Sequence, residues 1–208
     1  MLVIGLTGGI GMGKSAAAEH FARRGVPVFN ADAYVHRLYE GEAVRPIEAA
    51  FPGVTQGGRV DRKLLAEQVA GAPERLKELE RIVHPLVVKA ETEFLREQER
   101  KGERLAVLEI PLLFETGAEE RVDVTIVLSA PAEVQRKRVM ARPGMTREKF
   151  AGLAQRQLPD ADKRARADFI VDSGMSLADM LLKIDRLIES LQEREGRVME
   201  RLRHQYPD

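Results

Sequence analysis

The sequence of 208 residues contains no cysteine, and only 5% of its residues are aromatic. Without cysteine, the chain cannot form a disulfide, a zinc site with thiolate ligands or a cysteine nucleophile, and this lack fits a cytoplasmic protein. Its 33 basic residues are balanced by 33 acidic ones. The surplus of positive charge that non-specific nucleic-acid binding requires is therefore missing, although a neutral chain can still carry a local basic patch.

Long apolar runs are missing as well. No run approaches the roughly 18 residues of a membrane span, and the N-terminus has neither a basic segment nor a small-residue cleavage site. We therefore expect no signal peptide and no membrane partner. Asn30 is the single asparagine in the chain, so the N-K-x-D motif by which switch GTPases recognise guanine is absent.

What is present is typical of one compact α/β domain over 1–208, with 44% hydrophobic residues to form its core. We expect strands at 2–7, 26–30, 104–110, 122–128 and 168–172. We expect helices at 13–24, 31–40, 61–70, 73–101, 131–141, 146–165 (as two) and 176–203. Because most strands are continuously apolar and alternate with helices, the sequence predicts a parallel sheet covered on both faces.

Two segments depart from this alternation. The all-helical stretch at about 60–101 predicts an inserted helical subdomain, in which Pro85 should kink or divide the longer helix. Proline and glycine at 41–58 predict turns there. The R-P-G-M sequence at 142–145 predicts the start of a mobile flap, so we expect a lid at about 140–160.

The stretch GGIGMGKS at 8–15 matches the P-loop pattern G-x-x-x-x-G-K-[ST] in full, and it lies between an expected strand and an expected helix. Glycines leave backbone N–H groups free to surround phosphate oxygens, and the helix N-terminus adds its dipole. We expect Lys14 to bind the β and γ oxygens of a nucleotide and Ser15 to bind Mg²⁺. The motif therefore predicts a three-layer P-loop NTPase fold.

An alternative interpretation is a dinucleotide fingerprint, G-x-G-x-x-A, over residues 11–16 with Asp32 as the ribose-binding acid. That fingerprint should begin directly after the strand. Gly11 lies four residues beyond Thr7, whereas Gly8 of the P-loop follows Thr7 directly. The spacing favours the P-loop.

Carboxylates follow two of the expected strands. Asp32 could orient or deprotonate an acceptor hydroxyl, or it could cap the helix at 33–40. Glu109 could reach Mg²⁺ through water as a Walker-B acid, or it could be an ordinary carboxylate at a strand end. Glu115 is a weaker candidate. Local sequence leaves both alternatives open at Asp32 and at Glu109.

Basic residues cluster at Arg136, Lys137, Arg138 and Arg142. Arg138 and Arg142 share a helix face and could close over a triphosphate and its base, or the cluster could be a solvated surface. His84 is ordinarily a structural residue in such a helical insert. The last expected helix carries an apolar stripe that predicts core packing, with a dimer seam as the alternative: Leu177, Leu181, Ile184, Ile188 and Leu191.

Several segments together resemble the dephospho-CoA kinase family, in the family's order and over most of the chain. They are IGLTGGIGMGKS (4–15), VFNADAYVHRL (28–38), IVHPLV (82–87), LEIPLLFE (108–115), VDVTIVLSAPAEVQRKRVMAR (122–142) and ADFIVDSG (167–174). The P-loop alone is common, but its combination with the other segments is specific. The resemblance implies transfer of the γ-phosphoryl group of ATP to the ribose 3′-hydroxyl of dephospho-CoA, with a five-stranded core, a helical CoA-binding domain and a lid.

The resemblance also implies roles for particular residues. Gly11, Met12, Gly13, Lys14, Ser15 and Ala16 would bind the ATP phosphates. Asp32 would be the base or orienter at the 3′-hydroxyl, and the helix with His84 and Pro85 would line the acceptor site. Arg138 and Arg142 would serve the lid and the adenine region, and residues 171–174 would run alongside the adenine.

The sequence departs from the family pattern at three places. Asn30 stands where the family often has Asp, Glu109 where Asp is common, and residues 172–174 read D-S-G rather than D-N-x-G. Two alternatives to dephospho-CoA kinase stay open: another nucleoside or nucleotide kinase of the same fold, and a P-loop protein that binds ATP without turnover. We expect a monomer or a weak homo-oligomer.

Overall fold

The computed structural model describes residues 1–205. The chain divides into two compact units. We call one the sheet unit, formed by Met1–Phe29 and the chain from Leu95 onward, and the other the helical unit, formed by Asn30–Phe94. The second unit interrupts the first in sequence, so the chain leaves the sheet unit once and returns to it.

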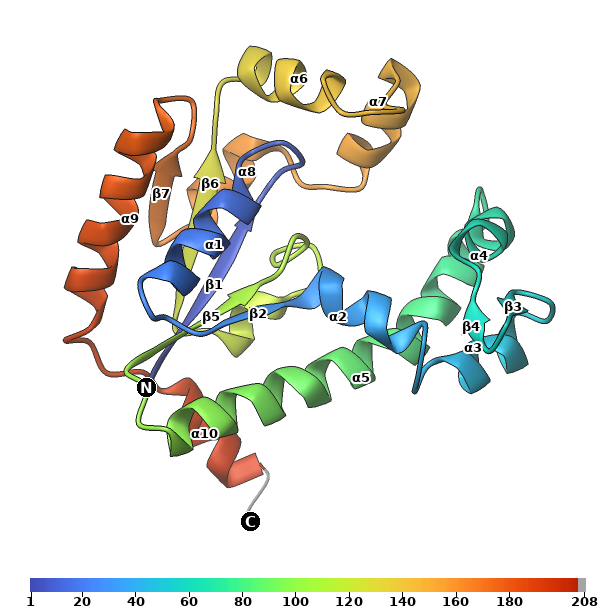
Figure 1. Cartoon of the computed structure of the whole chain (residues 1–208), viewed down its shortest axis with the longest axis horizontal. Helices are drawn as coiled ribbons and strands as arrows, with labels where there is room; N and C mark the ends of the chain where they lie inside the picture. The colour runs from blue at the N-terminus through green and yellow to red at the C-terminus, as the bar shows by residue number, and fades with distance from the viewer. Residues whose placement is uncertain (206–208) are drawn as a thin grey trace. The chain divides into compact units, whose positions relative to one another are not determined.

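A five-stranded sheet forms the centre of the sheet unit, with strand order β2-β5-β1-β6-β7 (Figure 1). The strands are β1 (Leu2–Gly8), β2 (Val28–Asn30), β5 (Leu105–Glu109), β6 (Val124–Ser129) and β7 (Phe169–Asp172). β1 pairs in parallel with β5 and β6, and β6 pairs in parallel with β7. The prediction of a five-stranded parallel sheet is confirmed.

Helices surround this sheet. They are α1 (Lys14–Arg23), α6 (Ala132–Met140), α7 (Arg147–Gln155), α8 (Asp160–Arg166), α9 (Leu177–Leu191) and α10 (Val198–Gln205), together with a 3₁₀ turn at Ala118–Arg121. α1 and α9 pack on one face of the sheet (Figure 1), where alternate residues of β1 such as Ile4 and Leu6 meet Phe21 and Ile184 in a core from which water is excluded. Burial of this apolar surface is the main stabilising contribution to the unit.

The helical unit contains four helices and one hairpin. They are α2 (Ala31–Leu38), α3 (Val44–Ala50), β3 (Thr55–Gln56), β4 (Arg59–Val60), α4 (Arg62–Val69) and α5 (Pro73–Arg100), the last of which runs on into the sheet unit. The unit begins at Asn30, earlier than the insert expected at about 60–101. Residues 41–58, expected to form turns, contain α3 and one side of the hairpin. Pro85 lies inside α5 without dividing it.

The C-terminal helix expected over 176–203 is two helices, α9 and α10, so that expectation is wrong. The chain turns at Gly196, where a Cβ would lie 2.4 Å from the carbonyl oxygen of Met1. Asp123 then accepts hydrogen bonds from the N–H groups of Arg197 (2.6 Å) and Val198 (2.9 Å) at the start of α10. Within residues 1–205, no helix is both long and apolar enough to cross a membrane.

Candidate functional site

The loop between β1 and α1 has the conformation that the P-loop motif predicts. Gly11 and Gly13 have φ angles of +76° and +88°, which residues with a Cβ rarely adopt. Gly13 is the N-cap of α1, so the open N-terminal turn of this helix faces the loop. The Nζ of Lys14 donates hydrogen bonds to the carbonyl oxygens of Gly8 (2.8 Å) and Gly9 (3.3 Å). The lysine is therefore folded over its own loop.

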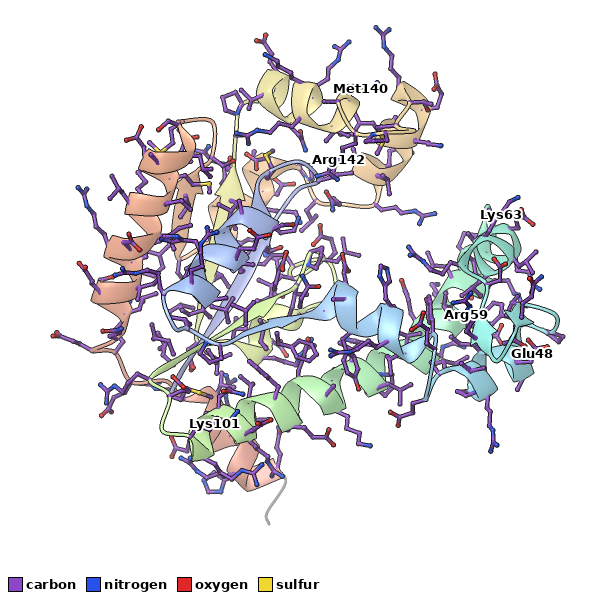
Figure 2. The ribbon with its side chains drawn as sticks, in the orientation of Figure 1. Glu48, Arg59, Lys63, Lys101, Met140 and Arg142 are labelled. Atoms are coloured by element: carbon purple, nitrogen blue, oxygen red, sulfur yellow. The ribbon has the colours of Figure 1, made fainter. Side chains whose placement is uncertain are left out.

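A cavity of about 340 Å³ opens beside this loop. Its lining residues come from the P-loop and the start of α1, from α6 and its exit turn, from the loop after β7 and from the start of α9: Gly11, Gly13, Lys14, Ser15, Ala16, Arg138, Arg142, Ser173, Met175, Leu177 and Met180. Figure 2 shows Arg142 just beyond the end of α6, beside Met140. The tertiary structure thus brings together a lysine, two arginines and the open end of a helix, a combination that suits a polyphosphate.

Ser173 fixes one of the two arginines and was not predicted as a side-chain contributor. It is 2% exposed, and its Oγ donates a hydrogen bond to the carbonyl oxygen of Met12 (2.8 Å). Arg138 donates from Nη2 to the Ser173 carbonyl oxygen (2.6 Å) and from Nη1 to its Oγ (3.2 Å). The loop after β7 is therefore joined both to the P-loop and to α6. A lone serine in D-S-G carries no sequence signal for this role.

The remaining wall of the cavity is apolar. It comes from Met175, Leu177 and Met180. Leu177, which the apolar stripe placed in the core, is 60% exposed, whereas Ile184, Ile188 and Leu191 of the same stripe are buried. Beyond its first turn the stripe is therefore core, in agreement with the core-packing interpretation.

Several predicted residues hold positions at the edge of this site. Met12 is 2% exposed and packs in the core, so its side chain does not face the cavity. Gly8 is the last residue of β1. Arg136 and Lys137 are exposed and do not line the cavity, in agreement with the solvated-surface interpretation for that half of the basic cluster.

The two acidic candidates of the sheet unit differ in their partners. Glu109 ends β5, is 5% exposed and lies opposite Leu6 in the register with β1. Glu115 forms an ion pair of 2.7 Å with the completely buried Lys163. Glu115 therefore holds α8 in place. Among residues 1–205, no group of three His, Asp or Glu side chains forms a metal-binding cluster of protein ligands alone.

Asp32, His84 and Pro85 belong to the helical unit. The N-cap of α2 is Asn30, whose Oδ1 accepts a hydrogen bond of 2.7 Å from the N–H of Ala33. The interpretation of Asp32 as the cap is therefore wrong, and its exposed carboxylate lies in the first turn of α2. His84 and Pro85 lie exposed on α5, so His84 is not a core histidine.

Comparisons with known proteins agree with this arrangement. A family model described as dephospho-CoA kinase matches residues 2–179. The dephospho-CoA kinase of Brucella melitensis biotype 1 is 54% identical over 191 residues, which is 92% of this chain and 96% of that protein. The crystal structure of a Thermus thermophilus protein is similar with a TM-score of 0.80 and 39% identity, covering 91% of this chain and 97% of that one. The dephospho-CoA kinase of Campylobacter jejuni has a TM-score of 0.62 and 25% identity, covering 91% and 96%. With a P-loop cavity on a parallel sheet and a family match over most of its length, this chain belongs to the dephospho-CoA kinase family.

Proposed function

We propose that this chain transfers the γ-phosphoryl group of ATP to the ribose 3′-hydroxyl of dephospho-CoA, giving CoA and ADP, and that the cavity beside the P-loop binds ATP. The observation that carries the proposal is the polarity of this cavity. Lys14, Ser15 and the start of α1 line one part, while Met175, Leu177 and Met180 form an apolar wall. Such a site offers cations and N–H groups to the phosphates and an apolar surface to a base.

In this proposal, charge neutralisation is the main contribution of the sheet unit. Phosphoryl transfer spreads negative charge over the transferred group and the leaving oxygen, so fixed cations stabilise the transition state. Lys14 would leave the carbonyl oxygens of Gly8 and Gly9 for the β and γ phosphates. Arg138 is already oriented by Ser173, and Arg142 would approach from the exit of α6.

Mg²⁺ fits the oxygen donors present, because a serine hydroxyl and a carboxylate are hard ligands that leave further positions for phosphates and water. We propose Ser15 and Glu109 for this role, with the ion neutralising charge on the β and γ oxygens when bound.

The helical unit would bind the acceptor in this proposal. Asp32 would orient or deprotonate the 3′-hydroxyl, and the exposed residues His84 and Pro85 of α5 would contact dephospho-CoA. An exposed carboxylate suits this role, since it is not already consumed as a helix cap. We also propose a cytoplasmic enzyme that is a monomer or a weak homo-oligomer, because most of the apolar stripe of α9 is used in core packing.

A coupled assay of ADP release tests the function. ATP, Mg²⁺ and dephospho-CoA are compared with the same mixture containing AMP, CMP or adenosine as the acceptor. We expect ADP only with dephospho-CoA, together with a product heavier by one phosphate. Turnover with a mononucleotide instead would contradict the acceptor, and ATP binding without turnover would favour a P-loop protein that only binds ATP.

A further inference from the structure

A single peptide group of the P-loop is held from both sides by glutamine side chains. The N–H of Ile10 donates a hydrogen bond of 3.0 Å to Oε1 of Gln157. The carbonyl oxygen of Ile10 accepts a hydrogen bond of 3.0 Å from Nε2 of Gln135. Gln135 lies on α6, and Gln157 follows α7 by two residues. The two amides present opposite ends, an acceptor to the N–H and a donor to the C=O.

The fit around this peptide is close. A Cβ at Gly9 would lie 3.1 Å from Nε2 of Gln135 and 3.5 Å from Oε1 of Gln157, so both amides lie against bare backbone. Neither glutamine lines the cavity beside the P-loop. An effect on a ligand in that cavity would pass through the loop, whereas Gln135 also lines a second cavity together with Met12 and Arg164.

The segments that carry the two glutamines are themselves fixed by contacts with other elements. Next to Gln157, the N–H of Leu158 donates to Oε1 of Glu115 (2.7 Å), and that carboxylate is also paired with the buried Lys163. On α6, Arg138 is bonded to Ser173. Gln135 precedes the lid expected at about 140–160, and Gln157 lies near the end of that segment, so the Ile10 peptide joins the P-loop to both ends of the expected lid.

We propose that Gln135 and Gln157 are positioning residues for ATP, which fix the Ile10 peptide so that the P-loop has its binding conformation before the nucleotide arrives. A loop that is already ordered loses less conformational entropy on binding, and its affinity for the ligand is therefore higher. This inference rests on the proposed function in taking ATP as the ligand of the loop. It adds two residues that no P-loop motif contains.

The first test is calorimetric titration of the whole protein with ATP and Mg²⁺, together with the KM for each substrate. Gln157→Met and Gln135→Met keep the length of the side chain but remove the amide. We expect each to weaken ATP binding by about 3- to 10-fold, the effect of one lost hydrogen bond, while the KM for dephospho-CoA stays within about twofold of wild type. Gln155→Met, an exposed position on α7, is the matched control and should leave both values unchanged.

Two further comparisons separate positioning from general damage. Because both amides act on one peptide, the double variant Gln135→Met/Gln157→Met should weaken ATP binding less than the product of the single effects. Glutamate substitutions at the two positions add the same negative charge, so the two variants can be compared directly. Gln157→Glu keeps an acceptor for the Ile10 N–H, whereas Gln135→Glu offers no donor to the Ile10 carbonyl. The Gln135→Glu protein should therefore bind ATP more weakly than Gln157→Glu.

Wild-type affinity in both methionine variants would overturn the inference, as would equal losses for both substrates with a lowered Tm. Strictly multiplicative effects in the double variant would also contradict a shared peptide. The titration does not depend on the acceptor. Failure of wild-type protein to bind ATP would contradict the proposed function, whereas unchanged binding in the variants would contradict this inference alone.

Discussion

Two polar residues at the start of α2 have separate roles although they lie two positions apart. Asn30 accepts the hydrogen bond of the Ala33 N–H and so satisfies one of the donors at the helix N-terminus. Asp32 follows in the first turn, with its side chain exposed. Asp32 is not the cap of α2, so its carboxylate stays available for the role that we propose for it at the acceptor hydroxyl.

Substitution at these two positions should therefore affect different properties. Asn30→Ala should lower the free energy of unfolding by about 1 kcal/mol, as loss of an N-cap does. Asp32→Asn should lower kcat by about 10²- to 10⁴-fold while ATP binding stays near wild type. Urea denaturation and the ADP-release assay measure the two effects. Unchanged turnover in Asp32→Asn would mean that the Asp32 carboxylate takes no part in the reaction.

Glu48, labelled in Figure 2, anchors the β3–β4 hairpin to α3. Its carboxylate accepts hydrogen bonds from the Thr55 hydroxyl (2.6 Å) and the Gly53 N–H (2.7 Å). These hydrogen bonds hold the pKa of Glu48 below its usual value. The bond from the Thr55 hydroxyl contributes most, and the bond from the backbone N–H of Gly53 comes next. A lowered pKa in the folded state adds stability above the unfolded pKa of about 4.3, and this stability is lost as pH falls through the folded value.

Glu48→Gln should therefore lower Tm at pH 7, and the difference from wild type should shrink as pH falls below about 4. Thermal unfolding at a series of pH values measures this. Glu67→Gln, at an exposed position of α4, is the control and should follow wild type throughout. A gap that stays constant from pH 7 to pH 3 would mean that the ionised carboxylate is not what stabilises the hairpin.

At the scale of elements, α8 is held by a buried charge. The Lys163 Nζ donates to Glu115 Oε1 (2.7 Å) and to the Pro111 carbonyl oxygen (3.3 Å), and the lysine is 0% exposed. Pro111 also accepts a hydrogen bond from the hydroxyl of Thr7, immediately before the P-loop. The PLLFE segment thus connects α8 to the end of β1.

Removing one member of this pair should be worse than removing both. Lys163→Met leaves Glu115 without its counter-charge and should lower the free energy of unfolding by about 3 kcal/mol. Lys163→Met/Glu115→Leu should recover most of that loss, since neither charge then remains. Denaturant titration measures both, with the exposed Lys137→Met as control. Little loss in Lys163→Met, or no recovery in the double variant, would contradict this account.

At the scale of the whole molecule, the division into a sheet unit and a helical unit suggests a division of substrates. ATP with Mg²⁺ should slow hydrogen exchange at the P-loop, α6 and residues 173–177 of the sheet unit. Dephospho-CoA should slow exchange within residues 30–94 of the helical unit, most strongly along α5. Exchange measured by mass spectrometry with each ligand alone tests this. Protection by dephospho-CoA confined to the sheet unit would contradict the proposed acceptor role of the helical unit.

Much of the sheet unit could be predicted, because its signals are local. Short apolar segments, most of them continuous, identified all five strands of this unit, and GGIGMGKS identified the loop and the helix that follows. The break at Gly196 could not be predicted, since it arises from close approach to Met1 and Asp123. The helix at Val44–Ala50 could not be predicted either, because Pro46 and the nearby glycines are typical of turns. In the folded chain, burial of Ile47 and Phe51 outweighs this local preference.

The sequence by itself determined that this chain is a P-loop kinase of the dephospho-CoA kinase family, because that information lies in contiguous residue types and their spacing. Only the tertiary structure decided what surrounds the loop. Gly11 is required not only for its φ of +76° but because a Cβ there would lie 2.5 Å from Cγ2 of Val139 on α6. Ser173, Lys163 and the two glutamines likewise owe their roles to neighbours 35 or more residues away in sequence. No local pattern encodes such contacts, because they exist only once distant elements have packed together.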